Sequence, residues 1–204
     1  ASGFAQYTLK LPGNRVILNA GARVDYFSGI KNNIAASPRF GISYNLIANT
    51  TLSASTGIYY QSPEYIWLTA DTRNENLKFL QANHYVVGIE HLFSPELRLS
   101  IEAYYKDLKN QIEFSEEYVP ELGKNIEDSY VVGKGRADGV ELFINKKYGK
   151  FTGWIGYTYS VSERKFDNLN NKQWFPTKYD RTHDASIVAT YKLSKRWTTS
   201  AVWV

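Results

Sequence analysis

Side chains that could do acid–base, nucleophilic or metal chemistry are few and scattered in this sequence, which has three histidines and no cysteine. His84 and His91 lie an odd number of positions apart in a stretch with a two-residue repeat, so they would point to opposite faces of a strand. His183 and Asp184 are adjacent and diverge in the same way. The nucleophile pattern G-x-S-x-G does not occur, and the glycines from Gly133 to Gly139 do not match a dinucleotide spacing. The sequence therefore predicts no enzyme, no metal site and no cofactor.

Aromatic side chains in polar segments are the better candidates for a binding role. Tyr65, Trp67, Trp174 and Phe175 lie in long, polar connections. Rigid aromatic rings often anchor ligands, sugars included, but they also pack loops and form the aromatic belts of membrane proteins. We expect these four residues to contact a ligand, and both alternatives stay open.

The elements that must position these residues are strands. In Glu96 to Tyr105, ELRLSIEAYY, apolar residues at every second position alternate with charged and polar ones, which predicts a strand with one apolar and one polar face. Its length matches the roughly 9–11 residues that a tilted strand needs to cross a bilayer. Similar alternation predicts ten strands: Phe4 to Leu11, Arg15 to Tyr26, Arg39 to Leu46, Thr51 to Tyr60, Tyr85 to Phe93, Glu96 towards Phe114, Val140 to Tyr148, Phe151 to Val161, Asp184 to Leu193 and Arg196 to the end.

The connections between the predicted strands alternate strictly between short and long. The short ones contain the Gly, Pro, Asn and Ser that hairpin turns favour. The long ones are Phe27 to Ala36, Gln61 to Asn83, roughly Lys109 to Lys134, and Ser162 to Arg181. All long connections would then leave one edge of the sheet, as in an antiparallel up-and-down transmembrane β-barrel. A soluble all-β sandwich or solenoid is the alternative, in which the apolar residues would face a protein core and the polar residues would face water.

Charged residues on the polar faces would line the lumen of such a barrel. We expect this position for Arg15, Arg23, Asp25, Arg39, Glu90, Arg98, Glu102, Lys106, Glu141 and Lys147. They could hold a structure inside the barrel through ion pairs, or they could simply be solvated. The net charge of +4 is modest and spread along the strands, so we expect no nucleic-acid partner.

Three segments carry a family resemblance. HYVVGIEHLFSPELRLSIEAYYKDLKNQI (His84 to Ile112), GRADGVELFINKKYGKFTGWIGYTYS (Gly135 to Ser160) and WFPTKYDRTHDASIVATYKLSKRW (Trp174 to Trp197) resemble the barrel of TonB-dependent outer-membrane receptors. The similarity runs in the family's order over nearly the whole chain, and it is closest to the versions found in Bacteroidetes-like bacteria.

The resemblance implies a larger, 22-stranded barrel that is filled by a plug domain and energised by the inner-membrane TonB complex. Residues 1–204 would be a C-terminal part of that barrel domain, about ten consecutive strands, with the plug and remaining strands outside this sequence. The implied function is import of a scarce nutrient (an iron chelate, cobalamin, a glycan or a peptide) across the outer membrane of a Gram-negative bacterium. Its implied partners are outer-membrane lipid, the plug, TonB and an unknown small ligand, and the four aromatic residues would lie in extracellular loops. A passive or structural barrel, such as a porin or adhesin, and a soluble β-sheet binding module are the alternatives.

Overall fold

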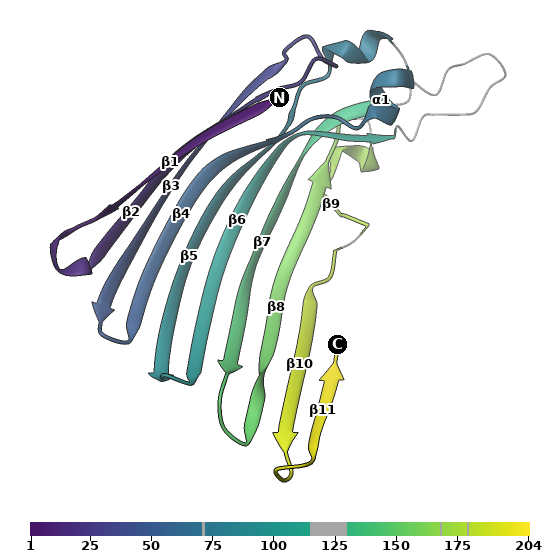
Figure 1. The fold of residues 1–204 in the computed structure, drawn as a ribbon. Coiled ribbons are helices and arrows are strands. Elements are labelled where there is room, and N and C mark those ends of the chain that lie inside the picture. The colour runs from purple at the N-terminus through teal and green to yellow at the C-terminus, as the bar shows by residue number, and fades with distance from the viewer. Residues whose placement is uncertain (71, 115–129, 168, 179) are drawn as a thin grey trace.

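The computed structural model describes residues 1–70, 72–114, 130–167, 169–178 and 180–204. They form one antiparallel sheet whose strands follow the order of the chain, from β1 to β8 and then β10 and β11, while the two-residue β9 pairs with β8 (Figure 1). The strands are β1 (Ser2–Lys10), β2 (Val16–Tyr26), β3 (Ile34–Ile47), β4 (Thr50–Gln61), β5 (Leu80–Ser94), β6 (Leu97–Phe114), β7 (Tyr130–Lys146), β8 (Phe151–Lys165), β9 (Phe175–Pro176), β10 (His183–Lys192) and β11 (Thr198–Trp203). The path of ten strands confirms the predicted all-β, up-and-down order.

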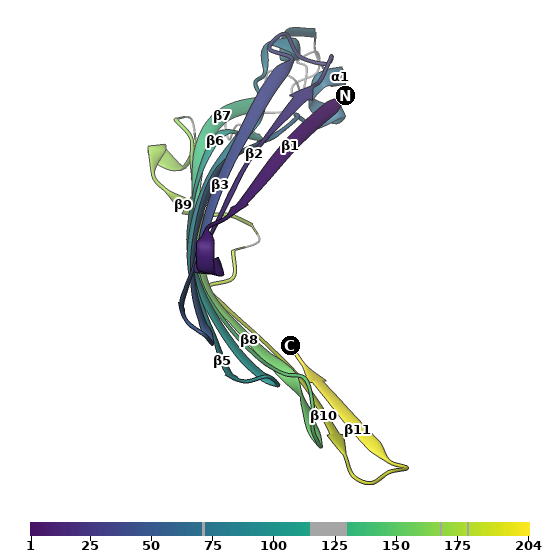
Figure 2. The same ribbon diagram turned by 60° about the vertical axis from the view of Figure 1, so that its left-hand side comes forward.

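The sheet is curved and open. In Figure 2 the sheet forms an arc, with β1 and β11 to the right of the central strands, and we call the concave side of this arc the hollow. These two edge strands each pair with one neighbour and not with each other. The short turns lie at one end of the sheet and the described parts of the long connections at the other, as the sequence predicted (Figure 1).

Register divides the strand residues between two faces, because paired residues point the same way while successive residues alternate. One face, called the apolar face below, carries a continuous row across eight strands: Leu9, Leu18, Ile42, Ala54, Val87, Ala103, Val140 and Tyr159. The opposite face, called the polar face, carries the charged residues. Val87 is 58% exposed in the middle of the apolar row, so no second layer of the described chain covers it.

Hairpin turns are closed by side chains as well as by backbone geometry. Ser94 Oγ accepts hydrogen bonds from the N–H groups of Glu96 and Leu97, each at 3.2 Å. Ser194 Oγ does the same for Arg196 and Trp197 at the turn between β10 and β11. Gly13 supplies the positive φ of +77° in the first turn. These turns hold the strands in the register that produces the two faces.

Strand β6 ends at Phe114, as its predicted course towards that residue implied, and β7 begins at Tyr130, ten residues before its predicted start at Val140. The expected connection from Lys109 to Lys134 is wrong at both ends, because pairing continues to Phe114 opposite Tyr130. A bulge at Asn110, with φ of +56°, interrupts the alternation that sequence analysis follows. The Asn110 side chain donates a 2.8 Å hydrogen bond to the carbonyl of Phe79, which fixes the bulge to the start of β5.

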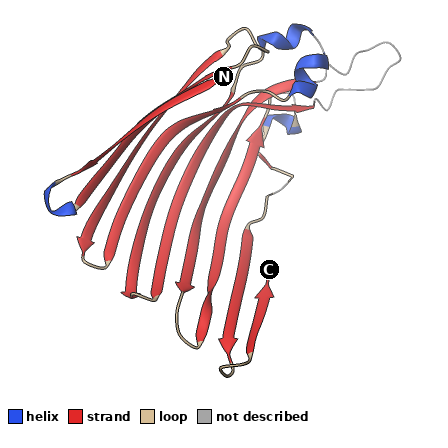
Figure 3. Cartoon of the chain, viewed as in Figure 1, coloured by secondary structure: helices blue, strands red, loops and turns tan. Residues whose placement is uncertain are grey.

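The long connection between β4 and β5 contains helices that the sequence analysis did not predict. They are α1 (Tyr65–Ala70) and the 3-10 helix η2 (Thr72–Asn76). The described residues elsewhere also form the 3-10 helices η1 (Pro12–Asn14) and η4 (Asn170–Lys172) (Figure 3). Helices of six and five residues are too short to leave a periodic pattern in the sequence. Ile30, Ala35 and Phe79 form a small buried cluster, and Phe27, Tyr60 and Leu68 pack against it. This cluster joins the connection between β4 and β5 to the long connection between β2 and β3. No helix among the described residues is both long and apolar enough to cross a membrane.

Candidate functional site

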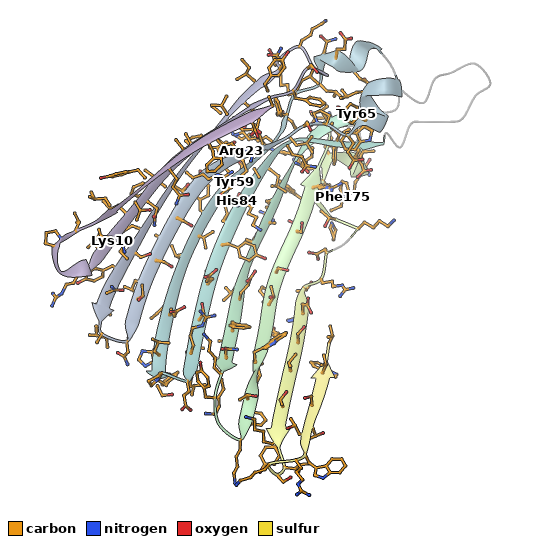
Figure 4. The ribbon with its side chains drawn as sticks, viewed as in Figure 1. Lys10, Arg23, Tyr59, Tyr65, His84 and Phe175 are labelled. Atoms are coloured by element: carbon orange, nitrogen blue, oxygen red, sulfur yellow. The ribbon has the colours of Figure 1, made fainter. Side chains whose placement is uncertain are left out.

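The polar face collects eight of the ten charged residues that we expected to share a surface. Pairing places Arg39 in line with His84 and Lys106, and Glu102 opposite Glu141. By alternation the same face holds Arg23, Asp25, Glu90 and Arg98. The other two, Arg15 and Lys147, flank β2 and β7 and lie outside the strands. The polar face is the hollow side of the sheet, and Figure 4 looks onto it.

A basic and aromatic group lies across β3, β4 and β5. The Arg39 guanidinium is 4.4 Å from the centre of the Tyr59 ring, and that ring is 4.4 Å from the ring of His84. Gly57 lies between Arg39 and His84 in the register. A Cβ at Gly57 would come within 3.1 Å of both Arg39 and Tyr59, so the missing side chain leaves the space in which they stack. Lys106 lies directly opposite His84, and we call Arg39, His84 and Lys106 the basic row.

Two cavities open beside this group. One of about 570 Å³ spans β1 to β4 and the other, about 490 Å³, lies nearer the long connections; Arg23, Arg39 and Tyr59 line both. Arg23 is neutralised by Asp25 at 2.7 Å. Arg39 has no ion pair with any described carboxylate, so its charge remains available to an anion. The cavities therefore combine a cation, an aromatic ring and polar side chains, which suits a ligand with an anionic group.

An acidic row lies on the same face, closer to the short turns. Glu102 and Glu141 face each other directly across β6 and β7, and the same register line continues through Thr158 to Asp184. Like charges in directly opposite positions repel each other. Glu90 differs because Arg98 pairs with it at 3.2 Å. The acidic row can therefore accept cations from a partner that enters the hollow.

The structure separates the four aromatic candidates. Tyr65 begins α1, is 71% exposed and meets Phe27 edge-on at 5.8 Å. Trp67 is half-buried in the same helix. Phe175 lies in the short strand β9, which corrects its expected place in a loop, and its ring is 6.1 Å from the buried Phe166. Trp174 packs on Lys134 and Arg136, which belong to the same face as the apolar row.

Sequence reasoning missed Tyr59 and considered His84 only as a metal ligand. Tyr59 has the strand position of a polar-face residue, two after Gly57, and that spacing was the available signal. The histidines do lie on opposite faces, since His84 pairs with Lys106 and His91 with Leu99. Among the described residues, no three His, Cys, Asp or Glu side chains are grouped so that they could hold a metal ion.

The antiparallel sheet has eleven described strands, ten on one path in chain order and β9 beside β8. It has one apolar and one polar face, with short turns at one end and long connections at the other, which is the architecture of a transmembrane β-barrel wall. The family model described as TonB dependent receptor-like, beta-barrel, matches residues 1–204. The chain belongs to this family. No curated protein matches the sequence.

Solved structures of TonB-dependent receptors have the same fold at low identity. The ferripyoverdine receptor of the Pseudomonas aeruginosa outer membrane, bound to ferripyoverdine, matches with a TM-score of 0.75 at 15% identity, over 98% of this chain and 27% of that one. The alcaligin outer-membrane receptor FauA of Bordetella pertussis matches with a TM-score of 0.71 at 16% identity, over 98% of this chain and 36% of that one. The ferric-catecholate import receptor Fiu of E. coli K12 matches with a TM-score of 0.71 at 15% identity, over 98% of this chain and 33% of that one. The chain thus spans about a third of these receptors' length.

Proposed function

We propose that this chain forms part of the barrel wall of a TonB-dependent receptor that imports a scarce nutrient across the outer membrane of a Gram-negative bacterium. The observation that carries the proposal is the two-faced sheet, in which eight strands contribute to one uncovered apolar row while the charged residues line the hollow. An uncovered apolar surface of this extent favours lipid over water. The remaining wall, the plug and the TonB complex belong to the complete receptor in this proposal.

The two charged rows would serve different partners inside the barrel. The acidic row, with Glu102 opposite Glu141, would bind cationic side chains of the plug, because two facing carboxylates are stabilised by a shared cation. The basic row lies nearer the long connections, where a ligand would enter. In the same proposal Arg15 and Lys147 line the lumen at the short-turn end.

The ligand would be an iron chelate, cobalamin, a glycan or a peptide, held by the long connections and the upper wall. Tyr65 is the most exposed of the four predicted aromatic contacts. Phe27 touches Tyr65 and also lines the smaller cavity beside Arg39, so the helix α1 and the basic row belong to one continuous surface. This continuity supports ligand contact by Tyr65 and Trp67 more than by Trp174 and Phe175.

Uptake by cells tests the import proposal. The complete receptor is expressed in an outer membrane, and accumulation of labelled iron chelates, cobalamin, oligosaccharides and peptides is compared with and without a functional TonB complex. We expect at least one ligand to accumulate only when TonB is functional. Equal, non-saturating entry in both strains would replace the proposal with a passive barrel.

The two faces can be tested separately because this chain contains no cysteine. Single cysteines at Ile101 and Glu102 differ by one position and belong to opposite faces. We expect a membrane-soluble probe to label the first and a water-soluble thiol reagent to label the second, in a complete receptor without other reactive cysteines. Rapid aqueous labelling at both positions would contradict the membrane orientation and favour a soluble sheet.

A further inference from the structure

The apolar face changes character beyond a pair of tyrosines towards the long connections. Tyr85 and Tyr105 stack with their ring centres 6.4 Å apart, as aromatic residues at a membrane interface would. In the next register line beyond them, Asp107, Arg136 and Glu163 lie side by side on β6, β7 and β8. Arg136 pairs with Glu163 at 2.7 Å, so most of the charge in this line is already neutralised.

The following register line contains three lysines on three neighbouring strands. Lys109 pairs with Lys134, and Lys134 pairs with Lys165, so all three side chains leave the same face of the sheet. We call them the lysine row. Like charges in opposite positions repel each other and destabilise a sheet unless an anion lies among them. The row is thus a second place where the sheet alone leaves repulsion uncompensated.

The nearby carboxylates neutralise one lysine of the row, Lys109, and leave the other two without an ion pair among the described residues. Asp107 lies 3.7 Å from Lys109, and Glu163 is already engaged by Arg136. Neither Lys134 nor Lys165 forms an ion pair with any carboxylate in the described part of the chain. The two ammonium groups of Lys134 and Lys165, on adjacent strands, therefore lack a counter-ion among the described carboxylates.

Trp174 borders the lysine row on the side of β9. Its ring lies 5.9 Å from Lys134 Nζ and 4.9 Å from the Arg136 guanidinium carbon. Phe175, the next residue, pairs with Arg164 on β8, which brings Trp174 alongside Lys165. An indole with cations around it is typical of the headgroup region of a membrane, where Trp has an apolar body and a polar N–H.

We propose that Lys109, Lys134 and Lys165, with Trp174 at their border, bind the phosphate of a lipid headgroup in the outer leaflet. Lys109 is four residues beyond Tyr105, about 13 Å along the strand. The acyl chains of a lipid whose phosphate lies on the row would therefore extend over the tyrosine pair and the apolar face. Free phosphate has no such second contact, so the site favours the lipid. The inference rests on the proposed membrane orientation of the apolar face.

The test uses the complete receptor in detergent micelles and two probes, diphosphorylated lipid A and the same lipid after enzymatic removal of its phosphates. Bound lipid is counted by native mass spectrometry, and the thermal midpoint is measured in parallel. Lys109, Lys134 and Lys165 are replaced together by Gln. The control variant replaces Lys146, Lys150 and Lys195, at the short-turn end of the sheet, by Gln. Both triple variants therefore remove three positive charges.

We expect the triple variant to lose affinity for the phosphorylated lipid by about fivefold for each lysine removed, while the control variant binds as the natural sequence does. Replacement of the same three lysines by Arg should keep the binding and show that the row tolerates substitution. Equal loss in the control variant, equal binding of the dephosphorylated lipid, or full competition by millimolar inorganic phosphate would each overturn the proposal.

Extraction of membranes with carbonate separates this inference from the proposed function. A receptor that stays in the membrane but fails the lipid test leaves the barrel proposal intact and overturns only the phosphate site. A receptor that is released from the membrane overturns both.

Discussion

The apolar and polar faces belong to the same strands and share one register, but their residues are chosen under different constraints. The apolar row from Leu9 to Tyr159 has neighbours of one kind throughout, and no residue in it needs a particular partner. On the polar face each group has its own arrangement: Arg39 stacks on Tyr59, Glu90 pairs with Arg98, and Glu102 opposes Glu141. A face that meets a uniform solvent requires only a residue class, while a face that meets other protein groups requires specific positions.

The largest expected effect comes from a charge placed on the apolar face. Ile101 lies between Ile89 and Leu142 in the middle of the sheet. Ile101→Arg should lower the free energy of unfolding by about 2–4 kcal/mol in lipid vesicles, because the guanidinium would enter the bilayer midplane. Urea titration followed by tryptophan fluorescence measures the change.

Its matched control is Ser100→Arg, one position away on the polar face. This variant should lower the free energy of unfolding by less than about 1 kcal/mol, since an arginine side chain in the hollow stays hydrated. Equal losses for the two variants would show that the faces do not differ in their surroundings and would reverse our assignment.

A smaller effect is expected where the polar face is closely packed. A Cβ at Gly139 would lie 2.6 Å from the carbonyl oxygen of Tyr159 and 2.7 Å from the hydroxyl of Tyr104. Gly139→Ala should therefore cost about 1–3 kcal/mol of unfolding free energy through displacement of the strand or the tyrosine. Gly156→Ala is the control, because its Cβ would approach no atom closer than 3.5 Å. The same urea titration compares the two, and a stable Gly139→Ala variant would refute the close packing.

The smallest effect should change sign between two glutamates of the polar face. Glu102→Gln removes repulsion from Glu141 and should stabilise a plug-deleted receptor by about 0.2–1 kcal/mol. Glu90→Gln loses its ion pair with Arg98 and should be neutral or destabilising by up to about 1 kcal/mol. Thermal midpoints in detergent give both values. A Glu102→Gln variant that is no more stable than the natural sequence would mean that the opposed carboxylates do not repel each other.

The plug sharpens this last comparison. In the complete receptor Glu102→Gln should weaken the hold on the plug, so the stabilisation should shrink or reverse. A stabilisation of the same size with and without the plug would indicate that no cation of the plug reaches the acidic row.

The order and direction of the ten main strands, the two faces and the alternation of short and long connections could be predicted from the sequence, while the two-residue strand β9 could not. These features follow from local periodicity, because residues two positions apart in a strand lie on the same face whichever strand is next to it. Ile101 and Ala103, for example, both lie on the apolar face. The same logic placed eight of the ten charged candidates on one face. It failed at Asn110, where one bulged residue shifts the alternation, and at α1, which is too short to leave a period.

Only the tertiary structure decided which residues meet across strands. Register depends on turn lengths and bulges many residues away, so nothing local to Glu102 indicates that Glu141 faces it, and nothing near Lys109 indicates Lys134 and Lys165. The stack of Arg39, Tyr59 and His84 needs three strands and the space at Gly57. Periodicity determines what kind of surface each strand presents, and pairing determines which charges share it.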